Sequence, residues 1–176
     1  MNHKIPFRYP EWDFFLNHIS YLSPMASISI KQALYNLCSS FVEDRILMYK
    51  KAMKEAQEAA NQEEKSSAGD KYETTRAMMQ IEKDKNAKQL EETIKLKKVL
   101  SLINPLSTSD TVELGSLVFT DKGNFYISIS AGKLMVDQTE YLAIAPTSPL
   151  GMTFISLKEK AHASFNGQRY TLLTVA

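Results

Sequence analysis

The sequence predicts an α+β protein in which a helical region precedes a small sheet domain. Residues 26–104 contain long charged and alanine-rich runs, a single glycine at position 69, and apolar residues at helical spacing. Residues 105–176 hold the other five of the six glycines and several short β-rich runs separated by turn signals. Helices and strands that occupy separate parts of a chain are typical of the α+β class.

Residues 1–25 form an N-terminal extension that is rich in aromatic residues, contains three prolines and shows no clear apolar period. Two interpretations are open. Residues 12–21 could form a short helix that docks on an apolar surface. Alternatively, the extension has no fixed structure, which is the more common state of a terminus that nothing ties down.

Residues 26–104 are predicted to form an antiparallel coiled-coil hairpin. Ser27 or Ser29 can cap the first helix, and the second helix follows Gly69 and stops before Pro105, which cannot continue a helix. Two arms of about 33 residues would each be about 50 Å long. The expected apolar stripe, close to a 3.5-residue period, consists of Leu34, Leu37, Phe41, Met48, Ala52, Ala56 and Ala59 in the first helix and Met79, Ala87, Leu90, Ile94 and Leu100 in the second.

Residues 105–176 are predicted to form a small antiparallel sheet. Asn166-Gly167 lies between two alternating runs, which is the strongest short-range hairpin signal. Gly123-Asn124 marks a second hairpin, and the run KLMVDQTEYLAIAP predicts a further strand or pair of strands.

One short helix is expected inside this sheet domain, in the run SPLGMTFISL. Ser148 can accept a hydrogen bond from the first turn as the N-cap. Pro149 then occupies the first helical position, where its missing amide hydrogen costs nothing.

The composition limits the classes of function. The net charge is +1 with 23% charged residues, so no overall basic field points to nucleic acid as a direct partner. The single cysteine, Cys38, excludes an intramolecular disulfide and fits a reducing compartment. No apolar run approaches the roughly 20 residues of a membrane span, and no secretory signal is visible. We therefore expect a cytoplasmic monomer without a membrane partner.

Asp70 and Glu73 lie at the predicted turn, and their spacing has two interpretations. As a capping box, Asp70 accepts from a backbone amide while Glu73 reaches back, and both charges favour the positive end of the helix. As a metal site, two carboxylates are too few to enclose Mg²⁺, which commonly binds one or two carboxylates together with waters and partner ligands. A metal-binding pair of this kind would complete the active site of a partner.

Other catalytic constellations are absent from the sequence. The three histidines are scattered without metal-ligand spacing. No phosphate-binding loop and no nucleophile, histidine and acid arrangement occurs. The eight methionines are interpreted as packing residues.

The stretch GDKYET resembles the hairpin tip of the bacterial Gre transcript-cleavage factors, which reads roughly G-D-x-S-E-N. Gly69, Asp70 and Glu73 fall on the glycine and the two acidic positions of that motif. VELGSLV, SPLG and QRYTLLTV resemble the family's opening strand, the start of its short helix and its closing strand. The resemblance covers about residues 28–176 and is closest to Gre-like proteins of the Bacteroidetes that carry SSAGDKYET.

The resemblance implies an FKBP-like C-terminal domain, residues 105–176, that docks on RNA polymerase. The hairpin would enter the secondary channel of the polymerase, with its acidic tip at residues 69–73. There Asp70 and Glu73 would help to hold a Mg²⁺ shared with the polymerase and promote cleavage of the 3′ end of backtracked RNA. On this interpretation the protein is an accessory factor, not an enzyme, and has no cofactor of its own.

The tip departs from the family pattern at several positions. Tyr72 and Thr74 replace the family's serine and asparagine, while Lys71 and Arg76 place positive charge beside the acids. These residues, with Gly69, are expected to support the tip. Two alternatives therefore stay open: a Gre-like regulator or inhibitor that binds polymerase without promoting cleavage, and a structural coiled-coil adaptor whose tip is only a capped turn.

Overall fold

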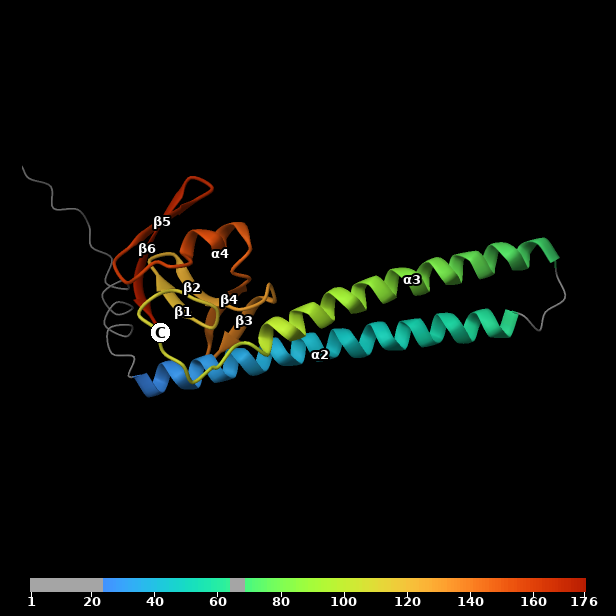
Figure 1. Ribbon diagram of the computed structural model, residues 1–176, viewed down its shortest axis with the longest axis horizontal. Helices are drawn as coiled ribbons and strands as arrows, with labels where there is room; N and C mark the ends of the chain where they lie inside the picture. The colour runs from blue at the N-terminus through green and yellow to red at the C-terminus, as the bar shows by residue number, and fades with distance from the viewer. Residues whose placement is uncertain (1–23, 64–68) are drawn as a thin grey trace, which may run out of the picture. The chain divides into compact units, whose positions relative to one another are not determined.

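The computed structural model describes residues 24–63 and 69–176, which fall into two compact units (Figure 1). The sheet unit comprises the described residues up to Tyr35 together with Ile103–Ala176, and the helical unit comprises Asn36–Leu102. The boundary between the units at Tyr35 and Asn36 lies inside the first long helix. The predicted domain of residues 26–104 instead contains nearly all of that helix. Nearly all of the predicted extension, residues 1–25, lies outside the described residues, so both interpretations of it stay open.

Two long helices, α2 (Pro24–Glu63) and α3 (Gly69–Leu100), account for the helical region. α2 begins with Pro24, a residue that favours the first helical position because its φ is already helical. Ser27 and Ser29 therefore lie inside the helix, and the prediction that one of them caps it is wrong. α3 ends before Pro105, as predicted, with Lys97 and Lys98 in its last turn, where the helix dipole favours positive charge.

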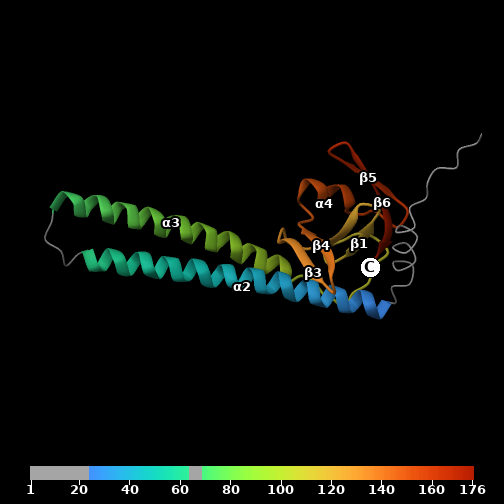
Figure 2. The ribbon, with the colours of Figure 1, turned by 180° about the vertical axis from the view of Figure 1, so that it is seen from behind.

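Within the helical unit the two helices run antiparallel beside each other (Figures 1 and 2). Lys97 Nζ lies 2.6 Å from Glu43 Oε1, and Lys83 Nζ donates to Gln57 Oε1 at 2.7 Å. The two contacts are fourteen residues apart on each helix. One register therefore holds over about four turns of the pair.

The apolar stripe of α2 differs from the predicted one. Leu34 and Ala56 are buried as expected, but Leu37 and Met48 are 38% and 52% exposed. The buried residues between them are instead Cys38, Val42 and Ile46. α2 carries apolar residues on two faces, and periodicity alone cannot tell which of the two faces the partner helix.

The buried stripe of α3 is partly polar. Leu100 is buried as predicted, but Ile94 is 39% exposed, while Asn86 and Thr93 are buried. Thr93 Oγ1 donates to the carbonyl of Gln89 at 2.8 Å, so its hydroxyl is satisfied inside the helix. No helix in the described part of the chain is both long and apolar enough to cross a membrane.

The sheet unit contains one six-stranded sheet in the order β3-β4-β2-β1-β6-β5. The strands are β1 (Leu117–Thr120), β2 (Gly123–Ile127), β3 (Gly132–Val136), β4 (Thr139–Ile144), β5 (His162–Phe165) and β6 (Gln168–Val175). All neighbours pair antiparallel except β2 and β4, which are parallel. The α+β class is therefore confirmed, and the prediction of a wholly antiparallel sheet is wrong at this one pair.

The predicted hairpin of β1 and β2 forms, but its turn is not at Gly123 and Asn124 as predicted. Both residues lie in β2, and Asp121 and Lys122 form the turn.

The other local predictions in this unit are confirmed. β5 and β6 are joined through Asn166 and Gly167, both with positive φ as the predicted hairpin turn requires. The run containing Asp137 forms a pair of strands, β3 and β4, rather than one. α4 (Pro149–Phe154) follows Ser148, whose side chain accepts from the amide of Gly151.

Three aromatic rings form the centre of the sheet unit's core. Phe125, Phe154 and Tyr170 contact one another edge to face, with ring centroids 5.0, 6.0 and 5.6 Å apart. Phe154 brings α4 onto this face of the sheet and is completely buried. The remaining buried members of the cluster are Val112, Val118, Ile127, Ile144, Ala163, Leu172 and Val175.

Candidate functional site

The predicted tip residues lie where α3 begins. α2 ends at Glu63 and α3 starts at Gly69, so Asp70 belongs to the first turn of the helix rather than to the position before it. Asp70 and Glu73 are three residues apart on a helix, and this spacing places them on one face. An acid in a first turn is favoured by the helix dipole whether or not it also caps the helix.

The side chains of Asp70, Lys71, Tyr72 and Glu73 lie outside the described residues, and so do residues 64–68. A capping box needs Asp70 at the N-cap, directly before the helix, and α3 already begins at Gly69, so that prediction is wrong. The metal-binding role stays a prediction. Thr74 and Arg76, two of the residues expected to support the tip, are exposed on the next turn of α3. The backbone thus brings the two acids to one end of the helical pair.

The stripe of α3 that faces α2 carries polar side chains, a feature that the apolar pattern did not predict. Asn86 is only 8% exposed, and its amide donates to Glu82 O at 2.8 Å and to Glu82 Oε1 at 3.0 Å. Lys83 and Lys97 lie on the same stripe and extend across to α2. The sequence does contain a signal for this polar stripe. Its polar residues recur at three- and four-residue spacing along α3, but a search for apolar residues alone does not detect them.

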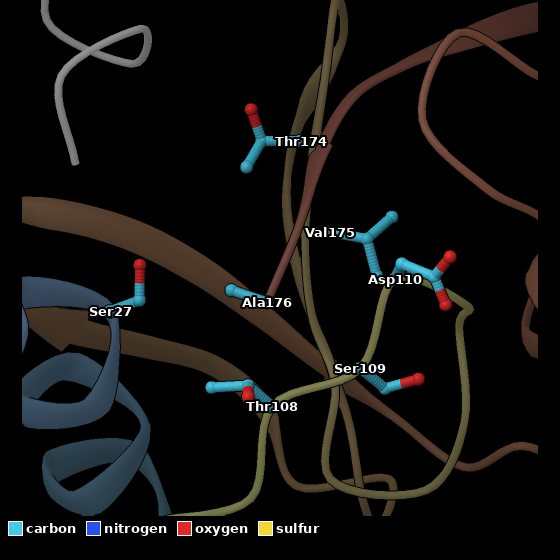
Figure 3. A pocket seen from close by; sticks show the side chains of 7 residues that line it. All are labelled: Ser27, Thr108, Ser109, Asp110, Thr174, Val175 and Ala176. Atoms are coloured by element: carbon cyan, nitrogen blue, oxygen red, sulfur yellow. The ribbon is translucent and has the colours of Figure 1, made fainter. Parts of the chain in front are cut away.

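A separate pocket of about 340 Å³ lies in the sheet unit, between the start of α2 and the end of β6 (Figure 3). Four of its seven lining residues carry a hydroxyl group, and one of these, Ser27 in the first turns of α2, is only 4% exposed. The remaining lining residues are Thr108, Ser109, Asp110, Thr174, Val175 and Ala176. Such a surface offers hydrogen-bond donors and acceptors but no nucleophile activated by a base.

The one acid that lines the pocket is already paired. Asp110 Oδ2 accepts from Lys158 Nζ at 2.9 Å, and this hydrogen bond, followed by that from Thr111, lowers the pKa of Asp110 below its ordinary value. Ser109 is held by Thr111, whose amide donates to its hydroxyl. Among the described residues, no three histidine, cysteine, aspartate or glutamate side chains gather as a metal site.

Lys31 is a buried charge that the sequence did not single out. Its side chain is 2% exposed, and its ammonium group donates to the carbonyl of Ser107 at 2.6 Å. Burial lowers the pKa of Lys31, and the negative charge of Glu113 acts in the opposite direction. Lys31 thus ties the first part of α2 to the segment that leads into the sheet.

Comparison of the chain with protein-family models, with curated proteins and with solved structures found no match.

Proposed function

We propose that this protein is a Gre-like transcription elongation factor that binds RNA polymerase and stimulates the polymerase to cleave backtracked RNA. The observation that carries the proposal is the position of Asp70 and Glu73. Both lie in the first turns of α3, at one end of a pair of antiparallel helices that each exceed 30 residues. About 48 Å of helix separates Gly69 from Leu100, which is long enough to deliver a carboxylate pair into a deep channel.

In the proposed reaction, water attacks a phosphodiester of the nascent RNA near its 3′ end. The bond from phosphorus to the 3′ oxygen breaks, and that oxygen takes up a proton. Asp70 and Glu73 offer the oxygen ligands that Mg²⁺ prefers, while the polymerase supplies the remaining ligands. When bound there, Mg²⁺ would supply stabilisation of charge on the attacking or leaving oxygen. The protein supplies two carboxylates, and the hydrolytic active site belongs to the polymerase.

The proposal includes two finer statements about the fold. We propose coiled-coil packing for the helical unit, supported by the three- and four-residue spacing of its buried stripe and by the constant register of the Lys83 and Lys97 contacts. We also propose an FKBP-like fold and a polymerase-docking role for residues 105–176. Three mutually packed rings, Phe125, Phe154 and Tyr170, occupy the core of that unit, which favours docking over an isomerase pocket.

A regulator that enters the same channel without promoting cleavage is the second candidate. It is favoured by Tyr72 and Thr74 at the tip, and by the positive charge of Lys71 and Arg76 beside the acids. A cationic neighbour competes with Mg²⁺ for the same carboxylates. The third candidate is a structural adaptor. In such a protein Asp70 and Glu73 would only stabilise the N-terminus of α3.

An RNA-cleavage assay on stalled, backtracked complexes of the matching polymerase tests the proposal. Wild-type protein should accelerate cleavage. Asp70→Asn and Glu73→Gln should each reduce the stimulated rate on the order of a hundredfold, because each removes a metal-binding charge. Loss of one negative charge from the first turn of a helix costs only about 0.3–1 kcal/mol, so we expect the melting temperature to change little.

Asp84→Asn is the matched control, since it makes the same chemical change on α3 away from the tip and retains the acceptor for Gln80. Its stimulated rate should equal that of wild type. If both tip variants still stimulate cleavage, the metal role is wrong. If wild type binds polymerase but never stimulates cleavage, the regulator is correct. If it does not bind polymerase, the adaptor is favoured.

A further inference from the structure

The facing stripes of the two long helices differ in chemistry. α2 presents apolar side chains such as Val42, Ile46 and Ala56, all of them buried. α3 presents a mixture in which Lys83 and Lys97 alternate with apolar positions. If the stripes were apolar only, a helix pair shifted by seven residues would be about as stable as the pair in the observed register, because the same kinds of side chain would then meet. The polar members of the stripe therefore help to select the register.

Two contacts define the register that is observed. Lys83 reaches Gln57 and Lys97 reaches Glu43, at 2.7 and 2.6 Å. Both lysines extend from the stripe of α3 to the same flank of α2, because Glu43 and Gln57 are fourteen residues, or two heptads, apart. Lys50 lies midway between them on that flank and is exposed.

Lys50 makes both neighbouring registers unfavourable. If α3 shifted by one heptad toward the N-terminal end of α2, Lys83 would lie opposite Lys50. If it shifted by one heptad toward the C-terminal end of α2, Lys97 would lie opposite Lys50. Like charges in contact are unfavourable, and discrimination between pairings commonly depends on such repulsion as well as on attraction. The order Glu43, Lys50, Gln57 on α2 therefore disfavours both shifts.

The register decides how far α3 extends at the tip. In the observed register Gln57 is opposite Lys83, so the end of α2 at Glu63 is level with about Ala77 of α3, and the first turn of α3 extends past it (Figures 1 and 2). A shift that put Lys83 opposite Lys50 would displace α3 by about 10 Å. The start of α3 would then be level with the end of α2.

We infer that Lys50, Lys83 and Lys97 are positioning residues, which select the register of the two long helices and thereby hold the first turn of α3 beyond α2. The register is a property of the protein alone. Its consequence for cleavage rests on the proposed function, because only then does the position of Asp70 and Glu73 matter to a reaction.

Exchanging the charges of Glu43 and Lys50 tests this inference without changing the composition. In Glu43→Lys/Lys50→Glu, Lys97 meets a lysine in the observed register, and Lys83 meets a glutamate after a one-heptad shift. Exchange of Lys51 and Glu55, an exposed pair within α2 3.7 Å apart, is the matched control. Circular dichroism checks that each variant is folded.

Disulfide formation reports the register, in a Cys38→Ala background. The pair Ala60→Cys and Met79→Cys tests the observed register, in which Gln57 is opposite Lys83. The pair Ala60→Cys and Tyr72→Cys tests the register shifted by one heptad. Wild type and the Lys51/Glu55 exchange should cross-link 60 to 79 preferentially. The Glu43/Lys50 exchange should change the ratio of the two cross-links by about tenfold toward 60–72, the size expected for exposed charge pairs. Adding Lys97→Glu should restore the 60–79 preference, because the new glutamate then attracts the lysine introduced at position 43.

An unchanged cross-link ratio in the Glu43/Lys50 exchange would overturn the inference. Cleavage assays separate it from the proposed function. If wild type stimulates cleavage, the shifted variant should lose stimulation while still binding polymerase. If wild type stimulates none but the ratio changes as described, the proposed function fails and the register inference stands.

Discussion

At the scale of single residues, Lys31 shows how a charge is accommodated in the sheet unit. Its methylene stem is almost fully buried on α2, and its ammonium group has one close acceptor, the carbonyl of Ser107. Removal from water disfavours the charged form, so burial lowers the pKa, while Glu113 partly opposes the shift. The folded state therefore holds the Lys31 proton less tightly than the unfolded chain does.

This lowered pKa predicts a pH dependence of stability. Between the lowered folded pKa of Lys31 and its unfolded value of 10.5, the unfolded state binds more protons than the native state. The free energy of unfolding should consequently gain a contribution as pH rises through that window. Lys31→Met retains an unbranched stem and removes the titrating group. Its free energy of unfolding at neutral pH should lie within about 2 kcal/mol of wild type, because burial of the charge offsets its hydrogen bond.

Urea denaturation of both proteins at about pH 7 and about pH 10 measures the effect, as the difference between them at each pH. Wild type should gain stability relative to Lys31→Met at the higher pH. Lys31→Arg is the control, since it keeps a charge that does not titrate in this range. An identical difference at both pH values would show that the Lys31 proton is not coupled to folding.

At the scale of elements, the predictions succeeded where the signal is local. Asn166 and Gly167 adopt the positive φ values that their hairpin turn needs, and Ser148 caps α4 directly before Pro149. Each of these depends on a few adjacent residues. The parallel pairing of β2 with β4 depends on residues far apart in the sequence, and no turn signal encodes it.

The stripe of α2 shows why an amphipathic pattern can be assigned to the wrong face. Leu37 and Met48 repeat at helical spacing as well as Cys38, Val42 and Ile46 do, and only tertiary contacts decide which set is buried. The contacts of Lys83 and Lys97 with α2 could not be predicted from the sequence either, because a lysine in a helix is normally assigned to the solvated face. The tip residues Asp70 and Glu73 were found from their motif, and their role stays a prediction.

Gly151 gives a prediction for α4. A Cβ added there would clash with the carbonyl oxygen of Ala145 and lie 2.9 Å from Ser148 Oγ, although the backbone itself is helical. Gly151→Ala must therefore displace the start of α4 and disturb Phe154 in the core. We expect a loss of about 2–4 kcal/mol in the free energy of unfolding, as for overpacked core sites.

Chemical denaturation measures this loss, with Met152→Ala as the control in the same helix. Met152 is 62% exposed, so its replacement should change stability by no more than about 0.5 kcal/mol. A Gly151→Ala protein as stable as the control would mean that α4 can shift to admit a methyl group.

At the scale of the whole molecule, buried apolar surface is distributed unequally between the two units. The sheet unit contains a continuous core that includes Phe125, Phe154 and Leu172. In the helical unit, several facing positions of α3 are polar, among them Lys83, Asn86 and Thr93. Since burial of apolar surface is the main stabilising contribution, the two units should differ in their resistance to local opening.

Amide hydrogen exchange should therefore report two levels of protection. The central strands β1, β2 and β4 should exchange only by global unfolding, whereas amides in the first half of α3 should exchange by local opening of lower free energy. Asn86→Leu and Thr93→Val replace polar side chains with apolar ones on the buried stripe, and together they should slow exchange in α3 about tenfold while leaving the strands unchanged. Ile81→Ala, at a side chain that is 67% exposed, should not slow exchange. Equal protection in α3 and in the strands of the wild-type protein would contradict this account, because the polar stripe would then have no effect on the stability of the helical pair.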